Sequence, residues 1–338
     1  MQKFYKLLFF LTLMMSTLIS ISSYSWMGMW IGLEVNVLSI IPMLINQKSK
    51  ISSESAIKYF FTQAFASSAI MLSIIILMSQ QYLQGKLIKD LPTLIMNSGF
   101  LMKMGMAPFH FWFPEVLEGL EWWNSMIMLT WQKIAPMVLL MYSNEFSLFF
   151  MISIIIGMVI SGLMAFNQIS LRKILAYSSI NHMGWMLSSM MISQSIWLIY
   201  FIVYSITTIN ITVIFNCTNT FYVPQMVSIW NFNPMIKLFF SMNFLSLAGI
   251  PPFLGFLPKW LIVQALIYNK LYLITIIMMI MTMIMIYVYL VTIMSSLIYT
   301  SSAMTWNILN SMKFKKFFSM VNFLMITSMV TVTLIVNT

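Results

Sequence analysis

The sequence has very few charged residues for its length. Only 7% of its 338 residues are charged, whereas 61% are hydrophobic. A folded globule of this size needs more polar surface than this to stay dissolved in water. The composition therefore excludes an ordinary water-soluble protein and indicates an integral membrane protein.

Side chains that bind metals are also scarce. Zinc and iron–sulfur sites built on cysteine need several thiolates, and Cys217 is the single cysteine. The two histidines, His110 and His182, are too few for the paired axial ligands of two haems. We therefore expect no redox centre, no metal and no other cofactor bound by this chain.

Apolar runs of roughly 20 residues, the length that crosses a membrane as a helix, recur along the whole chain. They predict an all-α polytopic membrane protein in which residues 1–338 form a single transmembrane domain of about eleven helices. The expected helices cover residues 4–22, 26–46, 56–79, 92–113, 122–142, 147–166, 171–191, 195–215, 235–265, 272–298 and 318–336. We expect the fourth and the ninth to be discontinuous.

The basic residues divide unevenly between the two ends of these helices. Of the 17, eleven lie on the side of the N-terminus, three lie on the opposite side and three lie inside helices. The eleven are Lys3, Lys6, Lys48, Lys50, Lys58, Arg172, Lys173, Lys237, Lys313, Lys315 and Lys316. Positive residues concentrate on the side where a membrane protein is made, so we expect the N-terminus there. The net charge of +10 thus reflects membrane topology and not nucleic-acid binding.

Two segments share one spacing of glycine, proline and phenylalanine. Both read G-x-x-P-F-x4-P, and they lie 249 − 105 = 144 residues apart. The first contains Gly105, Pro108 and Pro114, and the second contains Gly249, Pro251, Pro252 and Pro258. Proline-broken helices survive in lipid only where neighbouring groups satisfy the freed backbone.

A matched pair of broken helices is typical of transporters built from internal repeats, in which the ion path passes the breaks. This pattern predicts antiporter-like inverted repeats. Between the two breaks lie four whole expected helices and two half-helices, which make five spans, and an odd number of spans inverts the second half. The halves would be approximately residues 26–166 and 171–299. Two unrelated proline kinks are the alternative.

Four charged side chains are expected at membrane depth, namely Glu34, Lys103, Lys133 and Lys259. Each costs roughly 2.5 to 3.5 kcal/mol at a helix centre on insertion scales. We interpret them as a proton relay, because burial favours the neutral form of a lysine and a nearby carboxylate restores its charge. The alternatives are a snorkelling Lys259 and an ion pair between Glu34 and Lys103 that only locks two helices together.

Five further residues are candidates for an accessory role in proton transfer. His110 and Glu115 follow the first break, where a histidine can exchange protons near neutral pH or simply bond to the backbone. Ser178, Ser179 and His182 form a polar patch inside an apolar run. Such a patch fits either helix packing or a water-filled passage.

Five segments together resemble a known family. They are GLEVNVLSIIP (32–42), KMGMAPFHFWFPEV (103–116), TWQKIAP (130–136), LRKILAYSSINHMGW (171–185) and LAGIPPFLGFLPKW (247–260). These segments are similar to NADH-ubiquinone oxidoreductase chain 2, an antiporter-like membrane-arm family of mitochondrial respiratory complex I, and most closely to its insect members. The resemblance extends over essentially the whole chain.

The resemblance implies a proton-translocating subunit of NADH:ubiquinone reductase in the mitochondrial inner membrane, with its N-terminus in the matrix and its C-terminus in the intermembrane space. It implies that Glu34, Lys103, Lys133 and Lys259 form the polar axis for protons. NADH, FMN, iron–sulfur clusters and ubiquinone would then belong to other subunits. The implied partners are neighbouring antiporter-like and small membrane-arm subunits, and lipids such as cardiolipin.

Two other functions fit parts of the pattern. The broken helices alone would equally suit a free-standing cation/proton antiporter. The buried charges alone would suit a structural spacer subunit in which they serve as interhelical locks.

Overall fold

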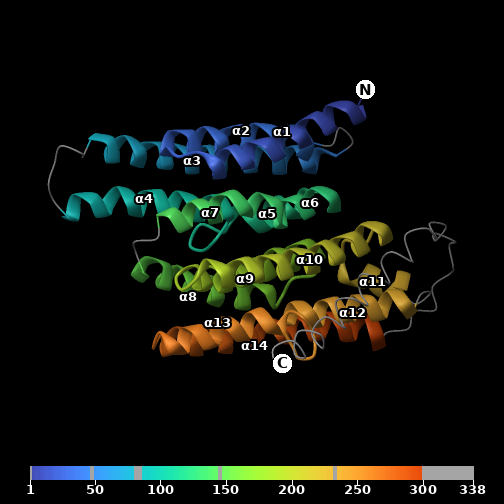
Figure 1. The fold of residues 1–338 in the computed structure, drawn as a ribbon. Coiled ribbons are helices and arrows are strands. Elements are labelled where there is room, and N and C mark those ends of the chain that lie inside the picture. Colours follow the sequence, from blue (N-terminus) through green and yellow to red (C-terminus); the bar gives the residue numbers. More distant parts are fainter. Residues whose placement is uncertain (1, 46–48, 80–85, 144–146, 231–233, 299–338) are drawn as a thin grey trace, which may run out of the picture. The chain divides into compact units, whose positions relative to one another are not determined.

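The computed structural model describes residues 2–45, 49–79, 86–143, 147–230 and 234–298, which are almost entirely helical (Figure 1). Within these ranges the β-pairing is limited to an isolated bridge between Ser170 and Tyr222. The chain divides into two compact units, unit 1 (Met1–Gly157) and unit 2 (Met158–Thr338).

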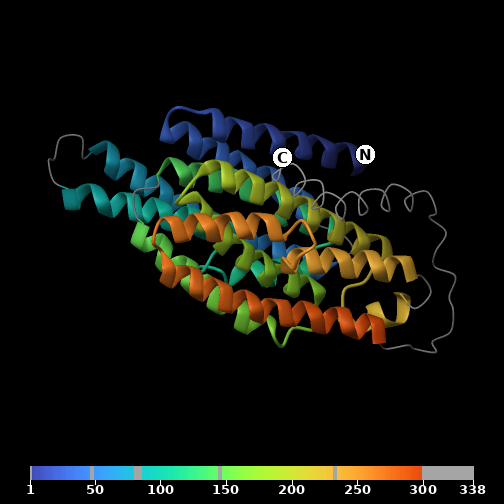
Figure 2. The same ribbon diagram turned by 60° about the horizontal axis from the view of Figure 1, so that its bottom comes forward.

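Unit 1 contains four helices of 19 to 30 residues, followed by shorter ones. Their bounds are α1 (Gln2–Ser22), α2 (Trp26–Leu44), α3 (Lys50–Ser79), α4 (Lys86–Met104), α5 (Trp112–Gly119), α6 (Trp122–Leu129), the 3₁₀ turn η2 (Trp131–Lys133) and α7 (Ile134–Tyr142). Helix α2 packs against α1 and α3, and α3 also contacts α4 and α5 (Figures 1 and 2). Helix α3 therefore borders both sides of the interruption between α4 and α5.

Unit 2 is built around a fully buried helix. After α8 (Ser147–Ala165), which is shared between the units, it contains α9 (Leu171–Met190), α10 (Gln194–Thr218), α11 (Val223–Trp230), α12 (Pro234–Ala248), α13 (Phe256–Tyr268) and α14 (Tyr272–Ile298). Helices α10, α13 and α14 all contact α9. Every residue from 174 to 190 of α9 is buried, so its polar side chains face protein on every side.

Within the described residues, six helices are long and apolar enough to cross a membrane. They are Phe4–Ser22, Trp26–Leu44, Lys50–Ser79, Leu148–Ala165, Gln194–Thr218 and Tyr272–Ser295. Large apolar side chains on these helices are exposed, such as Phe65 on α3 and Leu273 on α14. An apolar outer surface is suited to lipid, where only helices or closed barrels satisfy their own backbone groups.

Several helix bounds differ from the expected ones. Helix α3 begins at Lys50 instead of residue 56, because its first polar residues remain helical although they end the apolar run. Helix α11 was not expected, since eight residues give too short a periodic pattern to detect. The expected helix 122–142 is divided into α6, η2 and α7. The helix expected at 318–336 lies outside the described residues.

Candidate functional site

Helix α4 ends at Met104, directly before the glycine of the first repeated motif. Gly105 has φ +72°, in the left-handed region that glycine adopts without a steric penalty. A Cβ atom at this position would lie 2.9 Å from Cβ of Phe113. The Ala107–Pro108 peptide bond is cis, and α5 begins at Trp112.

Two neutral side chains donate hydrogen bonds to carbonyl groups in the last turn of α4. Nε1 of Trp112 donates to the carbonyl oxygen of Met102 at 3.2 Å. Nε2 of Gln63, from α3, donates to the carbonyl oxygen of Lys103 at 3.3 Å. The Met102 carbonyl also accepts from the backbone N–H of Gly105 at 3.1 Å. Because the Met102 and Lys103 carbonyls both have donors, the Lys103 amine is not needed to cap either of them.

Lys103 and Glu34 are electrostatically coupled without direct contact. Lys103 is 6% exposed, and Glu34 of α2 is half-buried. Nζ of Lys103 and Oε1 of Glu34 are buried and have no hydrogen-bond partner within the described part of the chain. The Glu34 carboxylate nevertheless acts on the charge of the Lys103 amine. The pair is therefore not a contact ion pair of the kind that locks two helices together.

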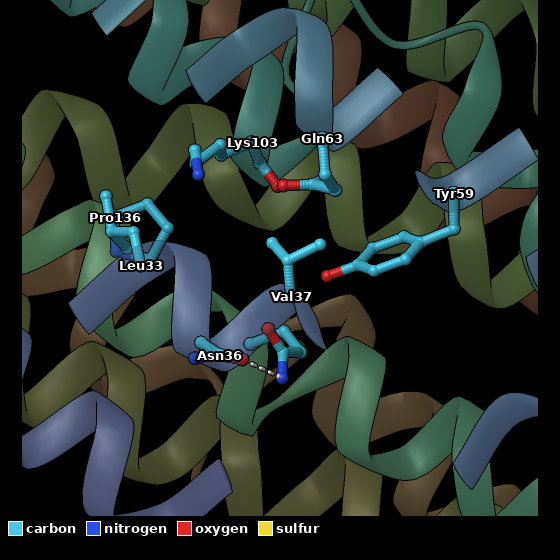
Figure 3. A pocket seen from close by; sticks show the side chains of 8 residues that line it. Leu33, Asn36, Val37, Tyr59, Gln63, Lys103 and Pro136 are labelled. Atoms are coloured by element: carbon cyan, nitrogen blue, oxygen red, sulfur yellow. Dashed lines mark hydrogen bonds between the residues drawn. The ribbon is translucent and has the colours of Figure 1, made fainter. Parts of the chain in front are cut away.

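A small pocket lies beside Lys103 (Figure 3). Its walls come from α2, α3, α4, η2 and α7, namely Leu33, Asn36, Val37, Tyr59, Gln63, Lys103, Gln132 and Pro136. Nε2 of Gln132 donates to Oδ1 of Asn36 at 2.8 Å. The pocket has a volume of about 10 Å³, roughly enough for one water molecule. The pocket thus adds polar groups and room for water to the surroundings of the Lys103 amine.

Lys133 lies in the 3₁₀ turn between α6 and α7 and is 1% exposed. Its Nζ is 5.2 Å from the centroid of the Phe113 ring, a distance at which an ammonium is attracted to an aromatic face. Phe113 is also the side chain that covers Gly105. The first interruption and the buried Lys133 therefore share one aromatic ring.

The second repeated motif has a closely similar backbone in unit 2. Helix α12 ends at Ala248, and Gly249 has φ +76°. The Pro251–Pro252 peptide bond is cis, and α13 begins at Phe256. Both following helices, α5 and α13, have a proline at their third residue, Pro114 and Pro258, where the missing N–H has no intrahelical partner to lose.

Lys259 caps the end of α12. Its Nζ donates to the carbonyl oxygen of Ala248 at 2.7 Å and to that of Leu247 at 3.4 Å. The same atom is 5.9 Å from the Trp185 ring centroid. A Cβ atom on Gly249 would lie 2.7 to 2.9 Å from Cδ, Cε and Nζ of Lys259. The Lys259 side chain therefore occupies the space that a side chain at position 249 would need.

Each polar residue of the α9 patch meets a buried tyrosine. Nδ1 of His182 lies 2.8 Å from the hydroxyl of Tyr200 on α10. Tyr204 of α10 lies close to Ser179, and Tyr289 of α14 lies close to Ser178. The three tyrosines, each 2% exposed, were not predicted. The four-residue spacing of Tyr200 and Tyr204 was the available signal, because it places both on one helix face.

The remaining two candidates have different surroundings. His110 is 3% exposed, and its Nδ1 has no hydrogen-bond partner within the described part of the chain. Glu115 is exposed and forms an ion pair with Lys58 of α3, with Oε2 and Nζ 3.0 Å apart. Its observed contact thus joins α5 to α3 at the protein surface.

The predicted residues divide between the two units. Glu34, Lys103 and Lys133 belong to unit 1, whereas Lys259, Ser178, Ser179 and His182 belong to unit 2. Sequence interpretation missed the polar side chains around Lys103, namely Asn36, Tyr59, Gln63 and Gln132. Asn36 and Gln132 lie within three residues of Glu34 and Lys133 in the sequence, which was a usable signal.

No group of three His, Cys, Asp or Glu side chains able to hold a metal ion occurs in the described ranges.

The family model described as NADH:quinone oxidoreductase/Mrp antiporter, TM, matches residues 23–285. The chain belongs to this family. NADH-ubiquinone oxidoreductase chain 2 of Anopheles gambiae is 49% identical over 278 residues, covering 82% of this chain and 81% of that protein. The protein of the same name from Lemur catta is 39% identical over 313 residues, covering 90% and 88%. These relatives confirm the resemblance that the sequence motifs indicated.

Solved structures share the fold. A chain of respiratory complex I from Thermus thermophilus with bound aureothin gives a TM-score of 0.88 at 20% identity, covering 96% of this chain and 78% of that chain. A chain of the Mrp complex from a Dietzia species gives 0.79 at 14% identity, covering 89% and 62%. The described part of the chain is thus an all-helical membrane fold of the kind found in antiporter-like proteins.

Proposed function

We propose that this chain is a membrane-arm subunit of proton-pumping respiratory complex I and conducts protons through Glu34, Lys103, Lys133 and Lys259. The observation that carries the proposal is the presence of a lysine amine beside each of two matching helix interruptions. In membrane transporters, interrupted helices supply the polar backbone at an ion path. Charged side chains at this depth are costly and mark such paths.

The chemistry of the path follows from the contacts of each lysine. An amine gains or loses one proton at Nζ, and the charge that results acts on its neighbours. At Lys103 the neighbour is the Glu34 carboxylate, whose negative charge interacts with the charged form of the amine. At Lys259 the neighbours are the two carbonyl dipoles at the end of α12. The amines of Lys103 and Lys259, one beside each helix interruption, can therefore bind and release protons one after the other.

The relatives support the proposed location of the chain in the mitochondrial inner membrane, and the distribution of basic residues supports its proposed orientation. In this proposal it spans the mitochondrial inner membrane several times, with its N-terminus in the matrix and its C-terminus in the intermembrane space. NADH oxidation and ubiquinone reduction take place in other subunits, which contain FMN and iron–sulfur clusters. Neighbouring antiporter-like and small membrane-arm subunits, and lipids such as cardiolipin, contact its outer faces.

The matching interruptions also support an internal repeat. In each, a left-handed glycine follows the last helical turn and a cis proline follows three residues later. We infer that residues 26–166 and 171–299 are inverted repeats and that α4 with α5 and α12 with α13 are the two discontinuous membrane helices.

Replacing Lys133 tests the proposal. Lys133→Met keeps a long apolar side chain at a site that is 1% exposed, but removes the exchangeable proton. We expect normal amounts of assembled complex with strongly reduced proton pumping in inverted membrane vesicles supplied with NADH and a quinone. Unchanged pumping at normal assembly would refute a central role for Lys133.

The alternative that the chain is a structural spacer predicts the opposite effects on assembly and pumping when Glu34 and Lys103 are both replaced. Glu34→Gln with Lys103→Gln removes both charges at nearly constant volume. A proton path predicts normal assembly with lost pumping, because no direct ion pair is broken. A spacer held by charge locks predicts impaired assembly with normal pumping per assembled complex.

Native electrophoresis distinguishes a free-standing antiporter. The family description includes Mrp antiporters as well as NADH:quinone oxidoreductases. A complex I subunit migrates within a very large assembly that oxidises NADH in the gel. Migration alone or as a small oligomer in gently solubilised membranes would overturn the assignment to complex I.

A further inference from the structure

The interior of unit 2 contains hydroxyl groups that the lysine path does not use. Tyr200, Tyr204 and Tyr289 come from two helices, and they lie beside His182, Ser179 and Ser178 of the buried helix α9, with the Tyr200 hydroxyl 2.8 Å from Nδ1 of His182. All three are almost completely buried. Phenylalanine would fill the same space without the cost of burying a polar hydroxyl. Three such hydroxyls in one region therefore need an explanation beyond packing.

Each group in this cluster can both donate and accept a hydrogen bond. A tyrosine or serine hydroxyl has one proton and two lone pairs, and a neutral imidazole has one nitrogen of each kind. The serines donate to carbonyls of their own helix, from Ser178 to Leu175 and from Ser179 to Ala176, both at 2.8 Å. The imidazole of His182 is the member of the cluster that can hold an extra proton near neutral pH. A proton entering or leaving His182 through Nδ1 must pass the hydroxyl of Tyr200.

A small pocket is lined both by members of this cluster and by residues that neighbour Lys259. Its lining includes His182, Tyr200, Tyr204, Leu247 and Pro258. The Leu247 carbonyl accepts a hydrogen bond from Lys259, and Pro258 precedes Lys259 in the chain. The pocket has a volume of about 10 Å³, roughly enough for one water molecule. One water molecule in it could contact both the cluster and the residues that neighbour Lys259.

We propose that Tyr200 relays protons between this pocket and Nδ1 of His182. In the resting arrangement the Tyr200 hydroxyl donates to Nδ1, which leaves the imidazole proton on Nε2. In the relay step the hydroxyl proton forms a bond to Nδ1 while the same oxygen takes a proton from a protonated water molecule in the pocket, which is left as neutral water. One O–H bond breaks and one forms, so the tyrosine stays neutral and His182 gains one proton. The reverse sequence returns the proton to the pocket.

The relay rests on the proposed proton-conducting function and adds to it a residue outside the four-residue path. The test is Tyr200→Phe in the assembled complex, because this variant keeps the ring and removes only the hydroxyl. The matched control is Tyr287→Phe, since Tyr287 is 53% exposed on α14 and stacks on Phe166. Lys133→Met is measured in parallel as a reference for the proposed function.

We expect Tyr200→Phe to assemble normally and to lower the rate of proton pumping about a hundredfold or more, the size of effect that a general acid–base group contributes. The pH profile of pumping should also change, because His182 loses the partner at Nδ1. Tyr287→Phe should retain both the rate and the profile. A purely structural role for Tyr200 would change the amount of complex but not the profile.

The outcomes separate the two proposals. Normal pumping in Tyr200→Phe together with lost pumping in Lys133→Met overturns the relay and leaves the proposed function standing. Normal pumping in both overturns the proposed function and the relay with it. If Tyr200→Phe does not assemble, His182→Gln replaces it, because the amide accepts the Tyr200 hydrogen bond but cannot hold the extra proton. Normal pumping in His182→Gln overturns the relay.

Discussion

The two interruptions in this chain have nearly the same backbone but differ in the groups that cap them. In unit 1, Gln63 and Trp112 donate to the last carbonyls of α4, and both donors are permanently neutral. In unit 2, the donor to the last carbonyls of α12 is the ionisable amine of Lys259. At the first interruption the Lys103 amine interacts electrostatically with the Glu34 carboxylate and caps no helix. At the second interruption the Lys259 amine caps α12. The two lysines therefore differ in what their charge holds in place.

The largest difference should appear when each lysine is replaced by methionine. Lys259→Met leaves two buried carbonyls without their donor, at a cost of about 1 to 3 kcal/mol for each. Lys103→Met leaves both α4 carbonyls capped. We expect the amount and the thermal stability of assembled complex to fall clearly in Lys259→Met and to fall little in Lys103→Met. Equal losses in the two variants would remove the distinction between the interruptions.

A smaller difference is expected when each left-handed glycine becomes alanine. Gly105→Ala and Gly249→Ala both place a Cβ in the left-handed region, which costs roughly 1 to 2 kcal/mol. The added atom would displace Phe113 in the first case and Lys259 in the second. We expect both to destabilise the assembled complex, with the greater loss in Gly249→Ala because the cap of α12 moves as well.

The control for the glycine pair is Gly162→Ala in α8. A Cβ at Gly162 meets its nearest neighbours at 3.6 to 3.8 Å, which is ordinary contact, and its backbone is helical. Alanine favours a helix over glycine by about 1 kcal/mol. Thermal melting of the assembled complex should be unchanged or slightly higher in this variant. A loss as large as that of Gly249→Ala would show that the interruption is not the sensitive feature.

The smallest effect should come from the exposed lysine of unit 1. Lys58 forms ion pairs with Glu54 at 3.1 Å and with Glu115 at 3.0 Å, and all three side chains are 44% to 67% exposed. Exposed pairs contribute about 0 to 1 kcal/mol. Lys58→Met should therefore shift the melting temperature little and leave pumping intact. A loss of pumping would mean that an exposed lysine belongs to the path.

The sequence predicted the features that depend on local backbone chemistry. Gly105 and Gly249 mark the ends of α4 and α12 because left-handed backbone and nearby proline are properties of a few consecutive residues. Charges such as Lys133 were evident because charge inside an apolar run is costly. The division of the expected helix 122–142 was not predicted, because a single 3₁₀ turn hardly changes the pattern of apolar residues.

Features that depend on contacts between distant segments were not predicted. Gln63 caps a carbonyl 40 residues later in the chain, and nothing in the sequence near Gln63 specifies that partner. Tyr289 meets Ser178 across more than 100 residues for the same reason. In a membrane, an apolar outer face is compatible with many helix arrangements, so hydrophobic periodicity constrains the packing less than it does in water.

The indole of Trp185 offers an optical consequence of the Lys259 arrangement. Its ring centroid is 5.9 Å from Nζ of Lys259, and its Nε1 is buried without a hydrogen-bond partner within the described ranges. A unit charge at this distance in a medium of low polarity produces a strong field across the ring. The absorption and emission of this one tryptophan therefore depend on whether the lysine is charged. The difference between the ultraviolet absorption and emission spectra of the protein and of a variant without Trp185 would report whether Lys259 is protonated.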